Sequence, residues 1–165
     1  KTSLSKERNE IIWETVERTN VYGGGAVMIV GLTNSGDLIL ERNWRAAIET
    51  YVIQFPGGLT DKQDESEEET AHREFFEETG YVAKKLIHIL CVPGSPVYSS
   101  IHATYYFAPE VTYVGNEKKD IAEEIEVITV PKNNLYKFLT NLPDETKLDL
   151  RVPGIIWILE GRGLL

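Results

Sequence analysis

Residues 55–81 read FPGGLTDKQDESEEETAHREFFEETGY, and the interpretation of the whole chain starts from this stretch. If its second half is helical, Glu74, Glu77 and Glu78 lie at i, i+3 and i+4 and share one face. Carboxylates at this spacing repel each other, so a divalent cation that prefers oxygen ligands, such as Mg²⁺ or Mn²⁺, is the expected partner. A Mg²⁺ ion held by one or two carboxylates usually also binds substrate phosphates. The stretch therefore predicts metal-assisted chemistry on a phosphorylated small molecule.

The alternative interpretation of these residues is a solvated acidic helix face, which is what most charge runs are. The residues on either side of the acidic stretch favour a helix with defined ends instead. Ser66 and Glu69 are spaced for a capping box at its start, and Gly80 suits the residue that follows its last turn. Upstream, residues 55–58 (FPGG) are typical of a tight turn whose glycines let backbone carbonyls approach a ligand. The side that such a helix would bury consists of Thr70, Ala71, Phe75 and Phe76.

The stretch resembles the Nudix box, the signature of the Nudix hydrolases, which runs G-x5-E-x7-R-E-U-x-E-E-x-G-U with U apolar. One position departs from this pattern, because six residues separate Gly58 from Glu65 where the pattern has five. The loop before the helix is therefore one residue longer, whereas the metal-binding half of the pattern is complete. So many fixed positions at set spacing make the resemblance specific. The matching residues are Glu65, Arg73, Glu74, Phe75, Glu77, Glu78, Gly80 and Tyr81.

Composition indicates one globular domain over residues 1–165, with the Nudix box at about 58–81 and 42% hydrophobic residues to build a core. The net charge is −9, and residues 61–78, with nine acidic and two basic side chains, contribute −7 of it. The acidity therefore belongs mainly to the candidate site. No Lys/Arg-rich patch stands out, which argues against nucleic acid as a partner.

Cysteine content and hydropathy narrow the function classes further. Cys91 is the only cysteine, which excludes intrachain disulfides and zinc clusters. No apolar run reaches membrane-spanning length and no secretory segment is visible. We therefore expect a cytoplasmic location and no membrane partner.

Apolar periodicity and turn residues predict a mixed sheet flanked by helices. Strands are expected at residues 11–18, 26–32, 38–42, 51–55, 85–92, 101–111 and 124–130, with a hairpin turn at 34–37. Besides the acidic helix, helices are expected from Pro131 to about Asn141 and over residues 155–160, the last one capped by Asp149. This mixed α/β class agrees with the α/β/α sandwich that the Nudix resemblance implies.

Stretches outside the box resemble the ADP-ribose (ADP-sugar) pyrophosphatases among the Nudix hydrolases. Residues 13–18 (WETVER) resemble the W-E-x-V-x-R opening strand of that subfamily. Residues 41–59 resemble its Q-x-R-P…x-x-I-E-F-P-A-G-L, with Ala46 for Pro, Gln54 for Glu and Gly57 for Ala. Pro96, 16 residues after Gly80, matches a characteristic proline, and residues 123–135 resemble E-x-x-E-V-x-x-L-P-x-x-x-L. The order of these stretches along the chain carries the argument.

The resemblance implies a Mg²⁺-dependent hydrolysis of ADP-ribose to AMP and ribose 5-phosphate. The metal would be bound by Glu74, Glu78 and the Gly57 carbonyl, with Glu77 as a further ligand or as a catalytic residue that positions water. Arg73 is one residue from Glu74, so we do not expect it on the same face and interpret it as a clamp on Glu65.

The general base of these pyrophosphatases comes from a mobile loop before a late strand, which here is about residues 115–124. Glu123 is the first choice for the base and Glu124 the second. Trp13 is the candidate adenine platform, because indole faces stack on bases, although a strand tryptophan packed in the core is the alternative. The residues expected to contact the rest of the substrate are Arg18 and Arg45, through charge-assisted bonds to diphosphate or ribose, with Gly58 and Pro96.

The subfamily also implies a homodimer that exchanges N-terminal strands, here within residues 1–20. Two alternatives remain. One is a Nudix hydrolase of another nucleoside diphosphate derivative, such as a dinucleoside polyphosphate or another nucleotide sugar, because binding loops set specificity. The other is a non-catalytic nucleotide-binding module, which the loss of a box glutamate would favour, although Glu74, Glu77 and Glu78 are all present.

Overall fold

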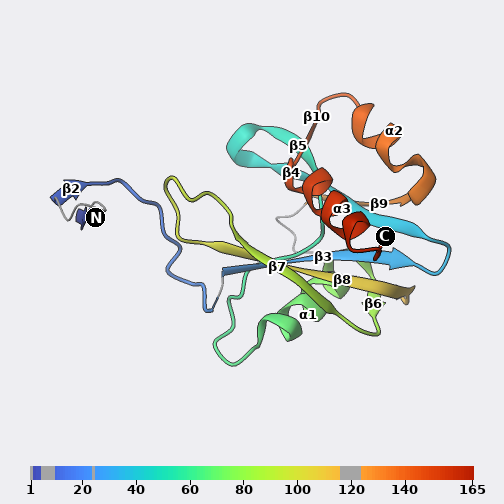
Figure 1. The fold of residues 1–165 in the computed structure, drawn as a ribbon, viewed down its shortest axis with the longest axis horizontal. Coiled ribbons are helices and arrows are strands. Elements are labelled where there is room, and N and C mark those ends of the chain that lie inside the picture. Colours follow the sequence, from blue (N-terminus) through green and yellow to red (C-terminus); the bar gives the residue numbers. More distant parts are fainter. Residues whose placement is uncertain (1, 5–9, 24, 116–123) are drawn as a thin grey trace.

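The structure is a computed structural model that describes residues 2–4, 10–23, 25–115 and 124–165. Its strands and helices follow one another along the chain as shown in Figure 1. The strands are β1 (Thr2–Leu4), β2 (Glu10–Ile12), β3 (Gly25–Thr33), β4 (Asp37–Arg45), β5 (Thr50–Gln54), β6 (Tyr81–Ala83), β7 (Ile87–Pro93), β8 (His102–Tyr113), β9 (Ile125–Pro131) and β10 (Thr146–Leu148). The α-helices are α1 (Glu67–Thr79), α2 (Leu135–Thr140) and α3 (Arg151–Gly161), and the 3₁₀ turns are η1 (Ala46–Ile48) and η2 (Lys132–Asn134).

Within the described residues, eight strands form one mixed sheet in the order β10-β5-β4-β3-β8-β6, with β7 also pairing with β8 and β9 with β4. The pairs β3–β8 and β5–β10 are parallel, and the other pairs in this sheet are antiparallel. Strands β3 and β4 share only the pair Leu32 and Leu38, so the sheet opens between them along most of their length.

Helices cover both faces of the sheet, with α1 on one side and α2 and α3 on the other (Figure 1). Ala71 and Phe75 of α1 pack in one apolar cluster with Ile29 of β3. The second cluster joins the opposite face of the sheet to Leu135 of α2 and Ile156 of α3. This arrangement confirms the predicted α/β/α sandwich with a mixed sheet.

Helix α1 begins and ends where its sequence predicts. The Ser66 hydroxyl accepts the Glu69 N–H at 3.2 Å, and the Glu69 carboxylate accepts the Ser66 N–H at 2.9 Å, which completes a capping box. Gly80 ends the helix in the left-handed region with φ 71°. Close approach to β3 requires a glycine, because a Cβ on Gly31 would lie 2.5 Å from the Phe75 ring. The two caps define the ends of α1, and Gly31 lets the helix pack close to β3.

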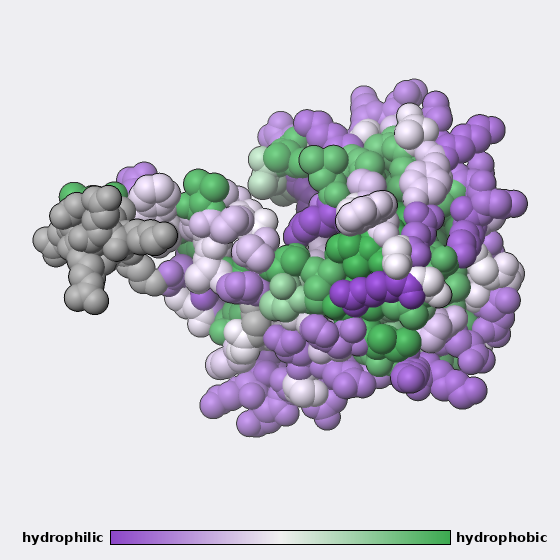
Figure 2. All heavy atoms as spheres, viewed as in Figure 1, coloured by the Kyte–Doolittle hydropathy of each residue, from purple (hydrophilic) through white to green (hydrophobic). Residues whose placement is uncertain are grey.

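Two predicted elements differ from those in the structure. The strand expected over residues 11–18 is wrong beyond Ile12, because residues 13–18 form no strand and the Val16 N–H donates instead to the Tyr98 carbonyl at 2.8 Å. Figure 2 shows a projection at one end of the molecule whose coloured surface is mostly polar or neutral, with a few apolar patches. The last helix begins at Arg151 rather than Ile155, because a proline is tolerated in the first turn of a helix.

The predicted cap of this helix is wrong by one residue, because the N-cap is Leu150 and it makes no side-chain cap bond. From the position before it, the Asp149 carboxylate accepts the Arg151 N–H at 2.9 Å. The three-residue strands β6 and β10 were not predicted, because they are too short for an alternating pattern. In the described ranges, none of the helices combines the length and the apolar character that crossing a bilayer requires.

Candidate active site

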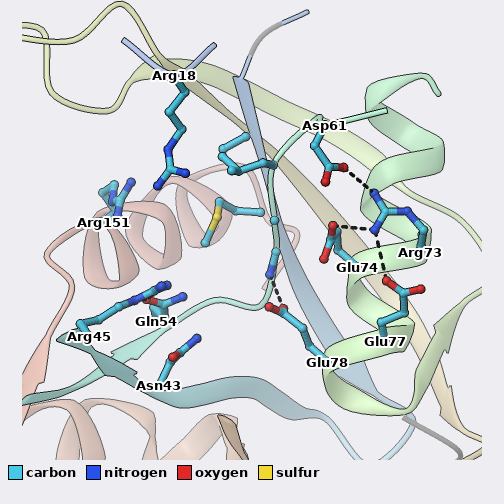
Figure 3. A pocket seen from close by; sticks show the side chains of 15 residues that line it. Arg18, Asn43, Arg45, Gln54, Asp61, Arg73, Glu74, Glu77, Glu78 and Arg151 are labelled. Atoms are coloured by element: carbon cyan, nitrogen blue, oxygen red, sulfur yellow. Dashed lines mark hydrogen bonds and ion pairs between the residues drawn. The ribbon is translucent and has the colours of Figure 1, made fainter. Parts of the chain in front are cut away.

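A cleft of about 720 Å³ opens beside α1, and its walls carry opposite charges (Figure 3). One wall, from α1 and the loop before it, is acidic. The other is basic and combines the N-terminal segment, the end of β4 and the start of α3. The acidic wall consists of Asp61, Glu74, Glu77 and Glu78, joined by Arg73, and the basic wall of Arg18, Arg45 and Arg151. A cleft with this layout can hold a cation on one side and an anion on the other.

The turn at residues 55–58 is hydrogen-bonded to β3 on one side and to the acidic wall on the other. The Pro56 and Gly58 carbonyls accept N–H groups of β3 at 2.9 Å each, and between them the Gly57 N–H donates to the Glu78 carboxylate at 2.7 Å. A Cβ on Gly58 would lie 2.3 Å from the carboxyl carbon of Glu74. A side chain at position 58 would therefore displace the Glu74 carboxylate, which lies against the backbone of the turn.

Arg73 is bonded to four acidic side chains. Its guanidinium donates to Glu65 at 2.8–2.9 Å, to Glu74 at 2.6 Å and to Glu77 at 3.1 Å, and it also reaches Asp61 at 3.5 Å. These bonds, led by the one to Glu65, raise the Arg73 pKa above its usual value, and Arg73 in turn lowers the pKa of Glu65. The predicted contact with Glu65 is present. The expectation that Arg73 and Glu74 do not share a face is wrong, because the long side chain bends back to its neighbour.

The carboxylates of the acidic wall fit a divalent cation by their chemistry. Glu78 is only 5% exposed, and burial raises the pKa of Glu74 despite the opposing bonds from Arg73. Buried carboxylates beside a backbone turn are hard oxygen donors that a cation would stabilise. In the described part of the chain no three acidic, histidine or cysteine side chains converge on one point. Arg73 donates to both Glu74 and Glu77, so a metal must compete with its guanidinium for these carboxylates.

A buried polar network lies beneath the basic wall. The Gln54 amide donates to Glu41 at 2.6 Å and accepts from the Arg45 guanidinium at 2.6 and 3.0 Å. Asn43 also donates to Glu41, at 3.3 Å. Burial raises the pKa of Glu41 to about 7, although a hydrogen bond from Asn43, the positive charge of Arg45 and hydrogen bonds with Gln54 and Glu78 oppose this rise. The side chains of this network therefore fix the position from which Arg45 faces the cleft.

The structure brings most of the predicted site residues together. The predicted residues that line the cleft are the expected metal ligands Gly57, Glu74, Glu77 and Glu78, the clamp Arg73, and the expected substrate contacts Arg18, Arg45 and Gly58. Glu123, the first choice for the general base, lies outside the described residues.

Three predicted residues do not line the cleft. Trp13 is half exposed, and its indole N–H donates to the Val97 carbonyl at 2.8 Å, so it is neither a core strand residue nor part of the cleft wall. Pro96 is exposed in the neighbouring turn. Glu124 is exposed at the start of β9, where it accepts the Tyr51 hydroxyl at 2.8 Å. Their proposed contacts with substrate or water stay predictions, since the structure shows only that they do not line this cleft.

The cleft also contains polar residues that were not predicted, namely Asn43, Gln54, Asp61 and Arg151. A signal for one of them, Asn43, exists in the sequence. Glu41, Asn43 and Arg45 alternate along one strand, which places three polar side chains on the same face of the sheet. Arg151 has no such signal, because it reaches the cleft only through the packing of α3.

Comparisons with known proteins agree with this geometry. Residues 24–148 match the family model of the NUDIX domain. An ADP-ribose pyrophosphatase of Bacillus subtilis is 32% identical over 125 residues, which are 74% of this chain and 66% of that protein, and the chain thus spans slightly under two thirds of it. An ADP-sugar pyrophosphatase of Mus musculus is 29% identical over 150 residues, 82% of this chain and 67% of that protein. The crystal structure of an ADP compounds hydrolase superposes with a TM-score of 0.69 at 27% identity, covering 85% of this chain and 75% of that one. The chain therefore belongs to the NUDIX domain family, whose members generally depend on divalent metal ions.

Proposed function

We propose that this chain is a Mg²⁺-dependent hydrolase that cleaves the diphosphate of ADP-ribose or a related ADP-sugar to AMP and a sugar phosphate. The observation that carries the proposal is the two-sided cleft, where buried Glu78 and partly buried Glu74 and Glu77 line one wall and three arginines line the other. A diphosphate with its metal carries both kinds of charge, so it can satisfy both walls at once. The names of the relatives, an ADP-ribose pyrophosphatase and an ADP-sugar pyrophosphatase, support the choice of substrate class.

Four groups of the acidic wall would hold the metal. They are the carboxylates of Glu74, Glu77 and Glu78 and the carbonyl of Gly57, all on residues that border the cleft. When bound, Mg²⁺ would supply charge neutralisation at the diphosphate and would lower the pKa of a water beside it. The bond between the Gly57 N–H and Glu78 keeps the turn and the helix in register for this purpose.

The basic wall binds and orients the substrate. A guanidinium forms paired charge-assisted bonds with phosphate oxygens, and Arg45 is already oriented by Gln54. Arg151 is held in a bidentate ion pair with Asp149, so its charge is partly neutralised. Arg18 enters the cleft from the N-terminal segment beside Arg151 (Figure 3). We assign Arg45 and Arg18 to the diphosphate or the ribose.

The proton from the attacking water needs an acceptor. Glu77 borders the cleft and is one third exposed, so it can position this water once Arg73 releases its carboxylate. Glu123 stays our prediction for the general base. Glu123→Gln is expected to lower kcat by about 100-fold or more if this residue takes the proton.

The test is hydrolysis of a substrate panel by the purified protein with Mg²⁺, with products identified by chromatography. The panel contains ADP-ribose, ADP-glucose, GDP-mannose, diadenosine polyphosphates, NADH and 8-oxo-dGTP. The proposal expects AMP and ribose 5-phosphate, formed most efficiently from ADP-ribose. Preferred turnover of another compound would overturn the substrate assignment and keep the metal chemistry. No turnover with either Mg²⁺ or Mn²⁺ would favour the non-catalytic nucleotide-binding module.

A further inference from the structure

Glu41 is a buried carboxylate that the proposed mechanism does not use. It lies on β4 directly opposite Gln54 of β5, and its exposed fraction is 0%. One oxygen, Oε1, accepts both the Gln54 and the Asn43 amide N–H groups, at 2.6 and 3.3 Å. Among the described residues no amide, hydroxyl or guanidinium donor reaches the other oxygen, Oε2, and the Glu78 carboxyl group lies within hydrogen-bonding reach of Glu41. A buried carboxyl group is unfavourable unless its neighbours satisfy it, so its contacts with Gln54, Asn43 and Glu78 indicate its role.

Gln54 connects Glu41 to the cleft. Its Nε2 donates to Glu41, and its Oε1 accepts from the Arg45 guanidinium at 2.6 and 3.0 Å. The orientation of this amide follows from its neighbours, because a guanidinium can only donate and Glu41 Oε1 accepts. If the acceptor on one side is removed, the amide can turn over and present its NH₂ group to Arg45, which also carries only donors. The placement of Arg45 therefore depends on a side chain that it does not touch.

We propose that Glu41 is a positioning residue for substrate binding: acting through the Gln54 amide, it holds the Arg45 guanidinium where it can contact the diphosphate. The inference rests on the proposed function only in assigning a diphosphate to the Arg45 side of the cleft. It requires no titration of Glu41, since Oε1 accepts both amide N–H groups whether or not Oε2 carries a proton. The hydrogen bonds from Glu41 through Gln54 to Arg45 also predict that the effect of a substitution at position 41 depends on the residue at position 54.

Binding of ADP to the metal-free protein, in the presence of EDTA, isolates the contribution of Arg45. Isothermal titration calorimetry would compare the wild type with Glu41→Leu, which removes both acceptor oxygens, with Arg45→Ala and with the double variant of both. Glu41→Leu is expected to weaken ADP binding about 10-fold, the size of one lost bond to a charged group. Because Glu41 acts through Arg45, the same substitution should have no further effect in the Arg45→Ala background.

Exchanging the side chains of Glu41 and Gln54 tests whether the bonds between them position Arg45, because the exchanged pair should restore binding. Gln54→Glu alone places two carboxyl groups 2.6 Å apart at the present contact and should lower both the melting temperature and the affinity for ADP. In the double variant Glu41→Gln/Gln54→Glu, the carboxylate introduced at position 54 can bind Arg45 directly, while the amide introduced at position 41 donates to that carboxylate. Its affinity for ADP should return to within about 3-fold of the wild type.

Kinetics separate positioning from general loss of structure. With the substrate that the panel identifies, Glu41→Leu should raise KM by about the factor seen for ADP and lower kcat by less, because the Arg45 contact is made in the ground state as well. Glu126→Gln is the matched control, since it removes a carboxylate from the neighbouring strand, 3.5 Å from Arg42 and outside the cleft. It should leave KM, kcat and ADP affinity unchanged.

Four results would overturn the inference. Three are wild-type ADP affinity in Glu41→Leu, additive effects of Glu41→Leu and Arg45→Ala, and no rescue by the exchanged pair. The fourth is wild-type affinity in Arg45→Ala, because Glu41 would then position a residue without a role in binding. The proposed function is tested separately, by hydrolysis of the substrate panel by the wild-type protein. ADP binding without metal does not depend on turnover, so the two failures can be told apart.

Discussion

At the scale of single residues, Gly57 and Gly58 differ in what a methyl group would meet. Gly57 has φ 152°, and a Cβ there would lie 2.0 Å from the Val27 carbonyl oxygen, which belongs to the backbone of β3. At Gly58 the nearest atoms belong to the Glu74 carboxylate, the end of a flexible side chain. A backbone cannot move aside as a side chain can. The two substitutions to alanine should therefore have different effects.

Gly57→Ala is expected to lower the free energy of unfolding by about 1–3 kcal/mol, because the new methyl group forces the turn away from β3. Gly58→Ala should cost less stability but displace Glu74 and weaken binding of Mn²⁺. Urea denaturation measures the first effect and electron paramagnetic resonance of free Mn²⁺ the second. Equal stability losses in both variants would contradict the difference in their surroundings.

Glu78 should be needed for metal binding and not for folding. Gln at this position keeps the oxygen that accepts the Gly57 N–H, a bond of 2.7 Å, but removes the negative charge. Glu78→Gln is therefore expected to abolish hydrolysis of ADP-ribose while its melting temperature stays close to that of the wild type. An active Glu78→Gln protein would refute the assignment of this carboxylate as a metal ligand.

At the scale of elements, α1 is tied to the loop before it by the pair of Glu65 and Arg73. Hydrogen bonds from Arg73, more than any other influence, hold the Glu65 pKa below its usual range, even though partial burial opposes them. The ionised form is thus favoured in the folded state. The resulting stabilisation is present above the unfolded pKa of about 4.3 and is lost as the pH falls through the lower folded pKa.

Glu65→Gln should therefore reduce the free energy of unfolding at pH 7 by about 1 kcal/mol and make the remaining stability less sensitive to acid between about pH 5 and pH 3. Urea denaturation at several pH values measures both effects. Glu68→Gln, which changes an exposed glutamate of the same helix, is the control and should retain the acid sensitivity of the wild type. A pH dependence identical in Glu65→Gln and the wild type would show that this pair does not contribute.

Elements with strong local signals could be predicted from sequence, and those that depend on distant partners could not. Helix α1 has its capping box at Ser66 and a glycine stop at Gly80, so local chemistry defines both ends. Residues 13–18 have strand-like residues, yet they form no strand and hydrogen-bond instead to the turn around Tyr98. Strand β10 pairs with β5, which lies almost a hundred residues earlier, and no short pattern records this pairing.

At the scale of the whole molecule, the acidic wall of the cleft was predictable and the basic wall only in part. The acidic wall comes from one helix and the loop before it, so the sequence positions of its residues also determine how close they lie in the structure. The basic wall joins Arg18, Arg45 and Arg151 from three distant segments of the chain. The resemblance to ADP-ribose pyrophosphatases suggested two of them, and the third enters only because α3 packs beside β5 and β8.

The N-terminal segment carries the last prediction, that of a homodimer. Strand β1 pairs with β2 in a separate two-stranded sheet, which lies apart from the body in Figure 1. Close to it, Ile12 is 87% exposed and Val16 is 66% exposed. Exposed apolar side chains on a projecting segment favour burial against a second copy of the chain.

We expect light scattering after size-exclusion chromatography to give twice the chain mass of 18.7 kDa. Replacing both Ile12 and Val16 with glutamate should reduce the mass to that of one chain, because charged groups oppose burial at the interface. Trp157→Glu is the control, as this residue is 73% exposed on α3, away from the N-terminal segment, and should leave the dimer intact. A wild-type mass of 18.7 kDa at all protein concentrations would refute the dimer, and a dimer lost only in the Trp157 variant would move the interface to α3.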